Sequence, residues 1–144
     1  MTNFVHRRQV RMEWGHCDPA GIVFNSRFFE FFDASTWLMF ETALGVPASE
    51  LETLYGIMGL PLVDAKARFL KPAKFNDVAE IASQVSEFRR SSFDVAHRLH
   101  VDGELAVLGH ETRVNALMVL RCARDAGPCA GAAGIQFEWG AECW

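Results

Sequence analysis

The fold expected for this chain is decided by residues 27–44, RFFEFFDASTWLMFETAL. Apolar side chains in this run point in nearly every direction of a helix with 3.6 residues per turn, so we expect a helix that is buried on most sides. Gly45 is predicted to end it, and Pro47 prevents its resumption. Asn25 or Ser26 is expected to cap its start. A single long helix wrapped by a sheet fits this pattern.

The flanking sequence supplies the strands of such a sheet. Apolar and polar residues alternate with a period of two in several segments, which is typical of half-buried strands. The segments expected to form strands are residues 5–14, 63–69, 78–88, 93–101 and 104–117. Asp102-Gly103 is a strong hairpin signal. The connections between the last three strands are too short for parallel crossovers, so these strands are predicted to form an antiparallel meander. Ser49-Glu50-Leu51-Glu52 matches a capping box and predicts a short helix to about Tyr55.

Just before the long helix, residues 13–25 read EWGHCDPAGIVFN and place the carboxylate of Asp18 in a tight turn. Pro19 holds Asp18 in extended geometry, and Gly21 permits backbone angles that a side chain would forbid. A carboxylate at the end of a strand and close to the N-terminus of a helix could take part in a catalysed reaction. Asp, Pro and Gly are also ordinary turn residues, and taken alone they favour a turn in which Asp18 satisfies a backbone amide.

The run from Asp18 to Phe24, DPAGIVF, resembles the active-site loop of the 4-hydroxybenzoyl-CoA thioesterase family of the hot-dog superfamily. The resemblance extends from about Val10 to Asn115. It implies an α+β hot-dog fold, in which an antiparallel sheet wraps around one long central helix. It also implies homodimers that extend the sheet and pair into homotetramers. Residues 117–144 depart from the family pattern, so we expect an atypical tail within one domain that spans residues 1–144.

The same resemblance implies an acyl-CoA thioesterase that releases free acid and CoA, with an aromatic acyl group such as 4-hydroxybenzoyl as the leading substrate. Asp18 would attack the thioester carbonyl directly or activate a water molecule. The backbone amide of Asn25 and its neighbours in the first helical turn would polarise the carbonyl oxygen. Two alternatives remain open: a short-chain acyl-CoA thioesterase, and a protein that binds CoA esters without turnover.

Two further sets of residues are candidates for substrate binding. Arg89-Arg90-Ser91-Ser92 reads as a solvated hairpin tip or as a phosphate clamp, because guanidinium forks and hydroxyls suit phosphate oxygens. By the resemblance, Arg90 and Ser91 match the CoA-binding position best, with Lys71 and Lys74 as weaker candidates. His16 is predicted to anchor the loop beside the substrate. A Cys17–His16 nucleophile and base is the rival, but adjacent residues on an extended chain point to opposite sides.

Composition excludes several other classes of function. The chain has 144 residues, 50% hydrophobic and 22% charged, which fits one globular domain. Its net charge of −4 provides no overall positive field for nucleic acid. No segment approaches the roughly 20 consecutive apolar residues of a membrane helix.

The first eight residues lack the apolar core of a signal peptide, so a cytoplasmic protein is expected, with its four cysteines reduced. The histidines and cysteines show no metal-ligand spacing, and we expect neither a metal nor a cofactor.

Overall fold

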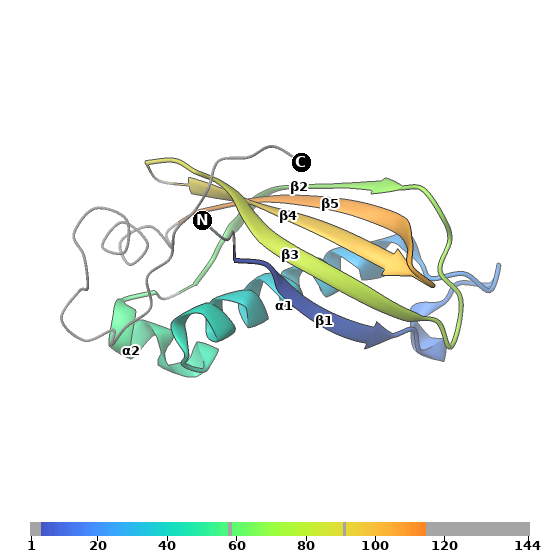
Figure 1. The fold of residues 1–144 in the computed structure, drawn as a ribbon, viewed down its shortest axis with the longest axis horizontal. Helices are drawn as coiled ribbons and strands as arrows, with labels where there is room; N and C mark the ends of the chain where they lie inside the picture. The colour runs from blue at the N-terminus through green and yellow to red at the C-terminus, as the bar shows by residue number, and fades with distance from the viewer. Residues whose placement is uncertain (1–3, 58, 91, 115–144) are drawn as a thin grey trace.

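The structure is a computed structural model that describes residues 4–57, 59–90 and 92–114. Its elements, in chain order, are β1 (His6–Arg11), the 3-10 turn η1 (Trp14–His16), α1 (Asn25–Leu44), η2 (Ala48–Glu50), α2 (Leu51–Tyr55), β2 (Leu62–Phe69), β3 (Val78–Phe88), β4 (Ser92–Val101) and β5 (Glu104–Val114). The strands form one antiparallel sheet in the order β1-β3-β4-β5-β2. Helix α1 lies along one face of this sheet (Figure 1). The expected α+β arrangement is confirmed, whereas the predicted tail at residues 117–144 lies outside the described residues.

The predicted meander is confirmed, because β3, β4 and β5 are neighbours in both sequence and space. The β4–β5 turn forms where the Asp102-Gly103 pair predicted it. Asp102 has φ of 52° and Gly103 has φ of 77°, so both residues adopt the left-handed conformation that tight hairpins require. The first strand is shorter than expected: it ends at Arg11, and the chain then turns into η1.

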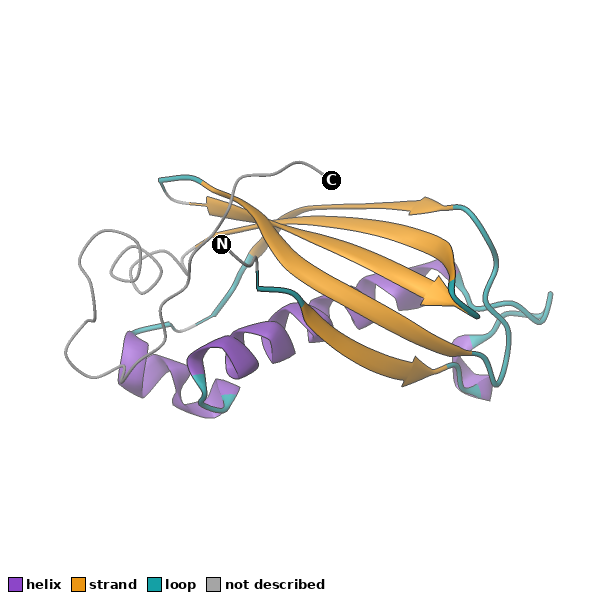
Figure 2. Ribbon diagram, in the orientation of Figure 1, coloured by secondary structure: helices purple, strands orange, loops and turns teal. Residues whose placement is uncertain are grey.

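Helix α1 buries one stripe and leaves the opposite side open. The buried residues recur three or four positions apart and are Phe28, Phe31, Phe32, Ser35, Thr36, Met39, Phe40, Ala43 and Leu44. Glu30, Asp33 and Thr42 are exposed on the other side, together with Leu38. The expectation of burial on most sides is therefore wrong for the isolated chain, since the sheet covers a single face of the helix (Figure 2).

The helix ends were predicted partly correctly. Gly45 ends α1 with φ of 71°, and its amide donates to the carbonyl of Glu41 at 2.8 Å. The start was predicted wrongly: the N-cap residue is Phe24, and no side chain caps the first turn. Ser49 does not cap the second helix either. Instead, the Glu41 carboxylate accepts a hydrogen bond from the Ala48 amide at 2.7 Å, which ties the end of α1 to the next segment.

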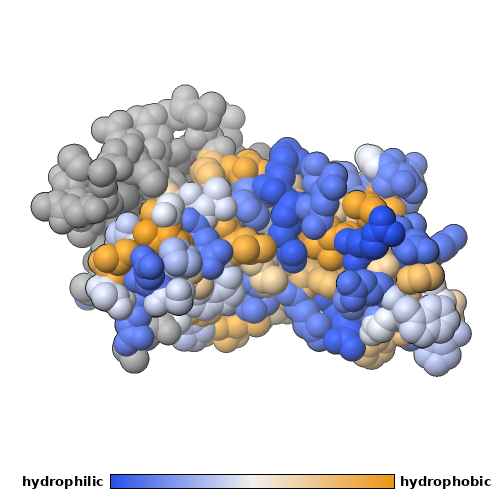
Figure 3. Space-filling model, turned by 90° about the horizontal axis from the view of Figure 1, so that it is seen from below, coloured by the Kyte–Doolittle hydropathy of each residue, from blue (hydrophilic) through white to orange (hydrophobic). Residues whose placement is uncertain are grey.

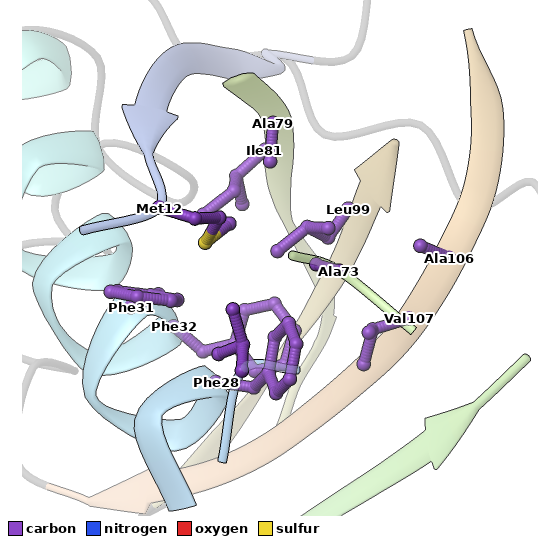
Figure 4. Packing of buried hydrophobic residues seen from close by; sticks show 11 residues of the cluster. Met12, Phe28, Phe31, Phe32, Ala73, Ala79, Ile81, Leu99, Ala106 and Val107 are labelled. Carbon is purple, nitrogen blue, oxygen red and sulfur yellow. The ribbon is translucent and has the colours of Figure 1, made fainter. Parts of the chain in front are cut away.

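The core between α1 and the sheet is rich in aromatic rings. Figure 4 shows Phe28, Phe31 and Phe32 of α1 directed towards strand residues such as Ile81 and Leu99. A second cluster surrounds Phe40, Phe93 and Leu51 near the other end of α1. Each fully buried side chain of this size stabilises the fold by roughly 1.5–3 kcal/mol relative to its exposed state. The aromatic run that predicted the helix therefore serves mainly as its packing surface.

Gly109 on β5 is required by this aromatic packing. A Cβ atom at this position would lie 2.5 Å from the Phe32 ring, which itself stacks on His97 with centroids 4.7 Å apart. We predict that Gly109→Ala lowers the free energy of unfolding by about 1–3 kcal/mol, because the ring has to leave its stacked position. Urea denaturation measures this loss. Gly15→Ala is the matched control, since nothing lies within 4 Å of its added methyl group, and equal stabilities of the two variants would contradict the prediction.

A polar network is buried between the middle of α1 and the sheet. His97 is 1% exposed, Glu111 2% and Arg113 2%. The Glu111 carboxylate accepts hydrogen bonds from the Thr36 hydroxyl at 2.7 Å and from Arg113 Nε at 3.0 Å, and His97 Nε2 lies 3.3 Å away. His97 Nδ1 lies 2.8 Å from the Ser83 hydroxyl. Buried polar groups of this kind need such partners, because each one left unpaired costs about 1–3 kcal/mol.

The same network clamps the helix to the loop before β2. Arg113 donates to the Leu60 carbonyl at 2.8 Å and to the Asp33 carboxylate of α1 at 2.5 Å. Burial alone would raise the pKa of Glu111, but hydrogen bonds from His97, Arg113 and Thr36 lower it to about 2. Burial lowers the pKa of His97. The stable state of the network is therefore an ionised Glu111 beside a neutral His97.

Candidate active site

Asp18 lies at the tip of a small hairpin between η1 and α1. Cys17 and Val23 form an antiparallel bridge, and the Asp18 amide donates to the Ile22 carbonyl at 3.0 Å. The Gly21 amide closes the turn on the Asp18 carbonyl at 2.9 Å, with Gly21 at φ of 79°. This geometry explains the local sequence, because a residue with a side chain is strained at that φ.

The carboxylate of Asp18 is held by one oxygen only. Oδ1 accepts a hydrogen bond from the Ala20 amide at 2.8 Å, as in an Asx turn. Among the described residues, Oδ2 has no hydrogen-bond partner, and Asp18 is half-buried. The turn role and a chemical role are therefore compatible: one oxygen fixes the side chain and the other remains available to a ligand.

The hairpin leads directly into α1. Ile22, the partner of Asp18 in the hairpin, is three residues before Asn25, the first residue of the helix. The Phe24 amide donates to the His16 carbonyl at 2.9 Å, which fixes the angle at which the helix begins. The first amides of a helix lack partners within it and carry the positive end of its dipole. Asp18 and the amide of Asn25 thus belong to one short segment, whose backbone is fixed by these hydrogen bonds.

His16 holds this segment together from the other side. Its Nδ1 accepts a hydrogen bond from the Glu13 amide at 2.9 Å, and its ring packs edge-on against Phe31 at 5.0 Å. The neighbouring Cys17 is half-buried, and its thiol faces the Glu13 carbonyl at 3.7 Å. The imidazole and the thiol are bonded to backbone groups of Glu13 and not to each other, so the arrangement does not form a Cys–His pair.

The hairpin is also anchored to the loop between β2 and β3. The Val23 amide donates to the Ala73 carbonyl at 2.8 Å, and Ile22 forms a bridge with Lys74. Lys71, the other lysine of this loop, is paired with Glu104. The structure therefore brings the two predicted lysines to the same end of the sheet as Asp18.

The basic run at residues 89–92 lies elsewhere. Arg89 and Arg90 follow the end of β3 and Ser92 begins β4, at the opposite end of the sheet from the Asp18 hairpin (Figure 1). The β3 strand between these ends has 11 residues, which corresponds to about 33 Å. Within one chain, the structure does not bring this run and Asp18 together.

The three candidates in this run have different surroundings. Arg89 is engaged within the tip: its guanidinium pairs with Asp94 and Glu87 and donates from Nε to the Ser92 hydroxyl at 2.9 Å. The hydrogen bond from Arg89 lowers the pKa of Asp94. Arg90 is exposed and has no side-chain partner among the described residues, whereas Ser91 lies outside them.

A separate surface groove of about 640 Å³ lies on the outer face of β1, β3 and β4. Arg7, Glu80, Arg98 and His100 contribute to its lining, and Asp18 does not. We therefore place the candidate site at the hairpin. Within the described ranges, no three His, Cys, Asp or Glu side chains gather in a way that could hold a metal ion. None of the described helices combines the length and apolarity needed to cross a membrane.

Comparisons with known proteins give the family. The sequence model described as the thioesterase-like superfamily matches residues 12–124. The chain is 33% identical over 114 residues to 4-hydroxybenzoyl-CoA thioesterase from Pseudomonas sp. (strain CBS-3), which covers 76% of this chain and 81% of the relative.

Solved structures agree with this result. An aspartate-to-asparagine mutant of 4-hydroxybenzoyl-CoA thioesterase, complexed with 4-hydroxybenzoyl-CoA, superposes with a TM-score of 0.71 at 31% identity and covers 76% of this chain and 82% of that one. A gentisyl-coenzyme A thioesterase superposes with a TM-score of 0.69 at 33% identity and covers 76% and 88%. These superpositions confirm the predicted hot-dog fold. Matched in sequence and in structure over most of its length, the chain belongs to the thioesterase-like superfamily.

Proposed function

We propose that this protein hydrolyses the thioester of an aromatic acyl-CoA, such as 4-hydroxybenzoyl-CoA, to the free acid and CoA. The observation that carries the proposal is the Asp18 carboxylate, with one oxygen fixed and the other available, in a hairpin that leads into the N-terminus of α1. The similar enzymes of known structure support an aromatic acyl group, because their names include 4-hydroxybenzoyl-CoA and gentisyl-CoA.

In the proposed reaction, the free oxygen of Asp18 attacks the thioester carbonyl or takes a proton from an attacking water. Negative charge then develops on the carbonyl oxygen, and the Asn25 amide at the start of α1 stabilises it. The C–S bond breaks and CoA leaves as the thiol, with its proton supplied by water. After direct attack, water then cleaves the acyl–Asp18 anhydride and supplies the oxygen of the acid; in the other route, the activated water has already supplied that oxygen. The solved complex of a relative, in which an aspartate is replaced by asparagine, supports the view that a carboxylate is needed for turnover.

The experiment that tests this proposal is thiol release from a panel of CoA esters. We expect the highest kcat/KM with 4-hydroxybenzoyl-CoA or another aryl-CoA. Faster release from acetyl-CoA or butyryl-CoA identifies a short-chain acyl-CoA thioesterase. Tight binding of CoA esters without any thiol release identifies a binding protein.

We propose further that the active protein is a homodimer joined at β2. The exposed apolar residues of this edge are Leu62 (47%), Val63 (59%), Phe69 (45%) and Leu70 (48%). The opposite edge, β1, carries three arginines and no acidic residue, whereas the charges of β2 (Asp64, Lys66 and Arg68) are of both signs. Like charges discourage strand pairing and exposed apolar residues favour it, so β2 is the better interface.

A two-fold axis through paired β2 strands makes them antiparallel, and the sheet then continues from one protomer into its partner. Figure 3 shows that apolar residues also reach the surface in separate patches on a second face. We propose that two dimers pair through such patches into a homotetramer. Light scattering of the wild type should give two or four times 16.1 kDa. We predict that Val63→Lys shifts the protein towards smaller species, because like charges then face each other across the edge, and an unchanged mass would contradict the β2 interface.

This pairing gives the basic tip a role. Because the two protomers run in opposite directions, the β3–β4 tip of one protomer lies at the same end of the combined sheet as the Asp18 hairpin of its partner. Arg90 would then bind a phosphate of the CoA held in the neighbouring site, together with Ser91. Arg89 is the supporting residue, since its ion pair with Asp94 shapes the tip.

We place this activity in the cytoplasm, where the Cys17 thiol stays reduced.

We predict that Arg90→Ala raises KM for the CoA ester roughly fivefold and leaves kcat nearly unchanged, because an exposed phosphate contact contributes about 1 kcal/mol of binding that does not change during the reaction. Steady-state kinetics at low salt measure this. Arg7→Ala, on β1, removes the same charge from another exposed site and serves as the control. Equal KM values for Arg90→Ala and the control would remove Arg90 from the site.

A further inference from the structure

His16 contacts each of the parts that build the candidate site, although its side chain takes no part in the reaction described above. The Glu13 amide donates to its Nδ1 at 2.9 Å, and the Phe24 amide, at the N-cap of α1, donates to its carbonyl at 2.9 Å. Its ring packs edge-on against Phe31, with ring centroids 5.0 Å apart. Asp18 follows two residues later. One residue therefore joins η1, the start of α1 and the segment that carries the carboxylate.

The partners of the His16 side chain are themselves held in place. Phe31 is 7% exposed, and its carbonyl accepts hydrogen bonds from Arg8 Nη2 at 2.8 Å and from the Ser35 hydroxyl at 2.6 Å. On the other side, the His16 amide donates to the Glu13 carbonyl at 3.0 Å, so two hydrogen bonds link this pair of residues. The imidazole thus connects a fixed residue of α1 with the turn that precedes the hairpin.

The hydrogen bond from Glu13 determines which nitrogen of His16 carries a proton. A backbone amide only donates, so Nδ1 has to offer its lone pair, and Nε2 carries the proton of the neutral ring. In the imidazolium form both nitrogens carry protons, and Nδ1–H would face the N–H of Glu13. Two donors form no hydrogen bond, so the protonated ring has to turn away from the amide. The contact at 2.9 Å therefore exists only while His16 is neutral.

Loss of this contact loosens the turn directly before the carboxylate. Turn η1 consists of Trp14–His16 only, and the Cys17 amide closes it on the Trp14 carbonyl at 3.1 Å. The next main-chain contact along the chain already belongs to the hairpin, where the Asp18 amide donates to the Ile22 carbonyl at 3.0 Å. A change in η1 therefore reaches Asp18 without an intervening element. A displacement of about 1 Å between reacting groups can cost on the order of 10²-fold in rate.

From these observations we infer that His16 is a positioning residue: its unprotonated Nδ1 holds the Asp18 hairpin in the reactive geometry, and hydrolysis is lost when His16 takes up a proton. Histidine suits this task because it is the side chain that usually changes charge between about pH 8 and pH 5. The inference rests on the proposed function, because it concerns the rate of that hydrolysis. It replaces the substrate contact predicted for His16 from the sequence by a role in orienting Asp18.

Other titratable and charged groups surround His16, on its own segment, on α1 and on β1. They are Glu13, Cys17, Asp18, Arg27, Glu30 and Arg8. Arg27 pairs with Glu30, and its guanidinium lies 3.5 Å from the Gly15 carbonyl. All of these groups remain when only position 16 is changed. A difference in pH dependence between wild type and a variant at this position therefore belongs to His16 itself.

Two substitutions separate the hydrogen bond of His16 from its ring packing. His16→Asn places Oδ1 where Nδ1 lies, so it keeps an acceptor for the Glu13 amide but has no ring. His16→Phe keeps a ring against Phe31 and has no acceptor. At pH 8 we expect kcat for 4-hydroxybenzoyl-CoA to fall about tenfold or more in His16→Phe and to stay within about twofold of wild type in His16→Asn. KM should change little in either variant, because the contact lies within the enzyme's own loop.

Both variants should keep the wild-type melting temperature, because Glu13 is exposed and its amide can bind water instead. A purely structural role of His16 would lower the melting temperature and kcat together in His16→Phe, and this result would overturn the inference. His100→Phe is the matched control, because it removes an imidazole whose Nδ1 has no hydrogen-bond partner in the described part of the chain. Its kcat should equal that of wild type.

The pH profile of kcat tests the role of the proton. As the pH is lowered from 8 to 5, kcat of the wild type should fall more steeply than kcat of His16→Asn, because the amide oxygen of asparagine does not titrate in this range. Identical profiles of the two proteins would overturn the inference, and so would equal kcat values of His16→Phe and wild type at pH 8.

Hydrogen–deuterium exchange of the Glu13 amide, measured by NMR, separates this inference from the proposed function, since it needs no substrate. At the same pH, exchange should be faster in His16→Phe than in wild type or His16→Asn, because the amide has lost its acceptor. If the wild type hydrolyses no thioester, the proposed function is wrong, and the exchange rates still show whether Nδ1 holds the turn. Equal exchange rates in His16→Phe and His16→Asn would overturn the inference even in an active enzyme.

Discussion

Asp18→Asn is expected to abolish thioester hydrolysis while the substrate still binds. Asparagine has nearly the shape of aspartate, and its side-chain oxygen can still accept the Ala20 amide that Oδ1 accepts at 2.8 Å. The hairpin and the start of α1 should therefore remain intact. Asparagine provides no anionic oxygen to attack the carbonyl or to accept a proton from water. The expected loss is at least ~10²-fold in kcat for a general base, and more for a nucleophile.

The measurement pairs kcat of the variant with its Kd for 4-hydroxybenzoyl-CoA, obtained by calorimetry. Asp102→Asn is the control, because it makes the same change in another turn aspartate, at a left-handed position that asparagine tolerates. Near-wild-type turnover of Asp18→Asn would return Asp18 to the role of a turn residue. Failure to bind substrate would mean that Asp18 positions the loop, and the catalytic group would then be sought at His16.

The second large effect concerns stability in acid. The pKa of Glu111 is held at about 2 in the folded protein, against 4.5 for an unperturbed glutamate. The folded state therefore releases this proton more readily than the unfolded state does, and the ionised group stabilises the fold above about pH 4.5. As the pH falls from 4.5 towards 2, that contribution disappears. A shift of this size corresponds to roughly 3 kcal/mol. His97, whose pKa is lowered by burial, adds a loss of the same sign that begins below its ordinary value of 6.5.

We predict that Glu111→Gln lowers the free energy of unfolding by about 3–5 kcal/mol at pH 7, because Arg113 loses its buried counter-charge. The difference from wild type should narrow as the pH is lowered below 4.5, since only the wild type has this carboxylate to protonate. Urea denaturation at several pH values measures both effects. If Glu111→Gln does not fold, Thr36→Val, which removes one hydrogen bond to Glu111, is expected to lose about 1 kcal/mol. If the difference in the free energy of unfolding between Glu111→Gln and wild type stays constant as the pH is lowered, the lowered pKa of Glu111 is contradicted.

The sequence predicted those features that follow from a regular period or from turn chemistry. The alternation in β2 to β5, the Asp102-Gly103 hairpin and the long aromatic helix all correspond to observed elements. In residues 93–101, His97 alternates in step with Phe93, Val95 and Leu99 and so falls on the apolar face of the strand, but this pattern does not reveal its hydrogen-bond partner. Glu111 and Arg113 lie two apart on the inward side of β5, and charged residues in a strand are expected to face solvent. Their pairing depends on Thr36 and Asp33 of a distant helix, which no local pattern reveals.

At the candidate site, prediction was limited in the same way. The turn at Asp18 was predictable from Pro19 and Gly21, because these residues restrict or permit particular backbone angles. The exposure of Trp14 was not, since a period of two placed it on the inner side of a strand that in fact ends at Arg11. The basic tip lies far from Asp18 because β3 runs from one end of the sheet to the other. The number of residues between the two sites does not reveal this distance in space.

The continuity of the Asp18 hairpin with the start of α1 has a consequence for how this protein can change over generations. Both groups proposed to act on the thioester carbonyl come from one uninterrupted run of the chain, residues 18–25. Arg90, proposed to bind a phosphate of the CoA, lies on another segment, the β3–β4 tip. Mutations that alter the affinity for CoA can therefore accumulate without passing through a form that has lost its hydrolytic chemistry. A chain built in this way can change how tightly it binds its substrate while it inherits its reaction unchanged.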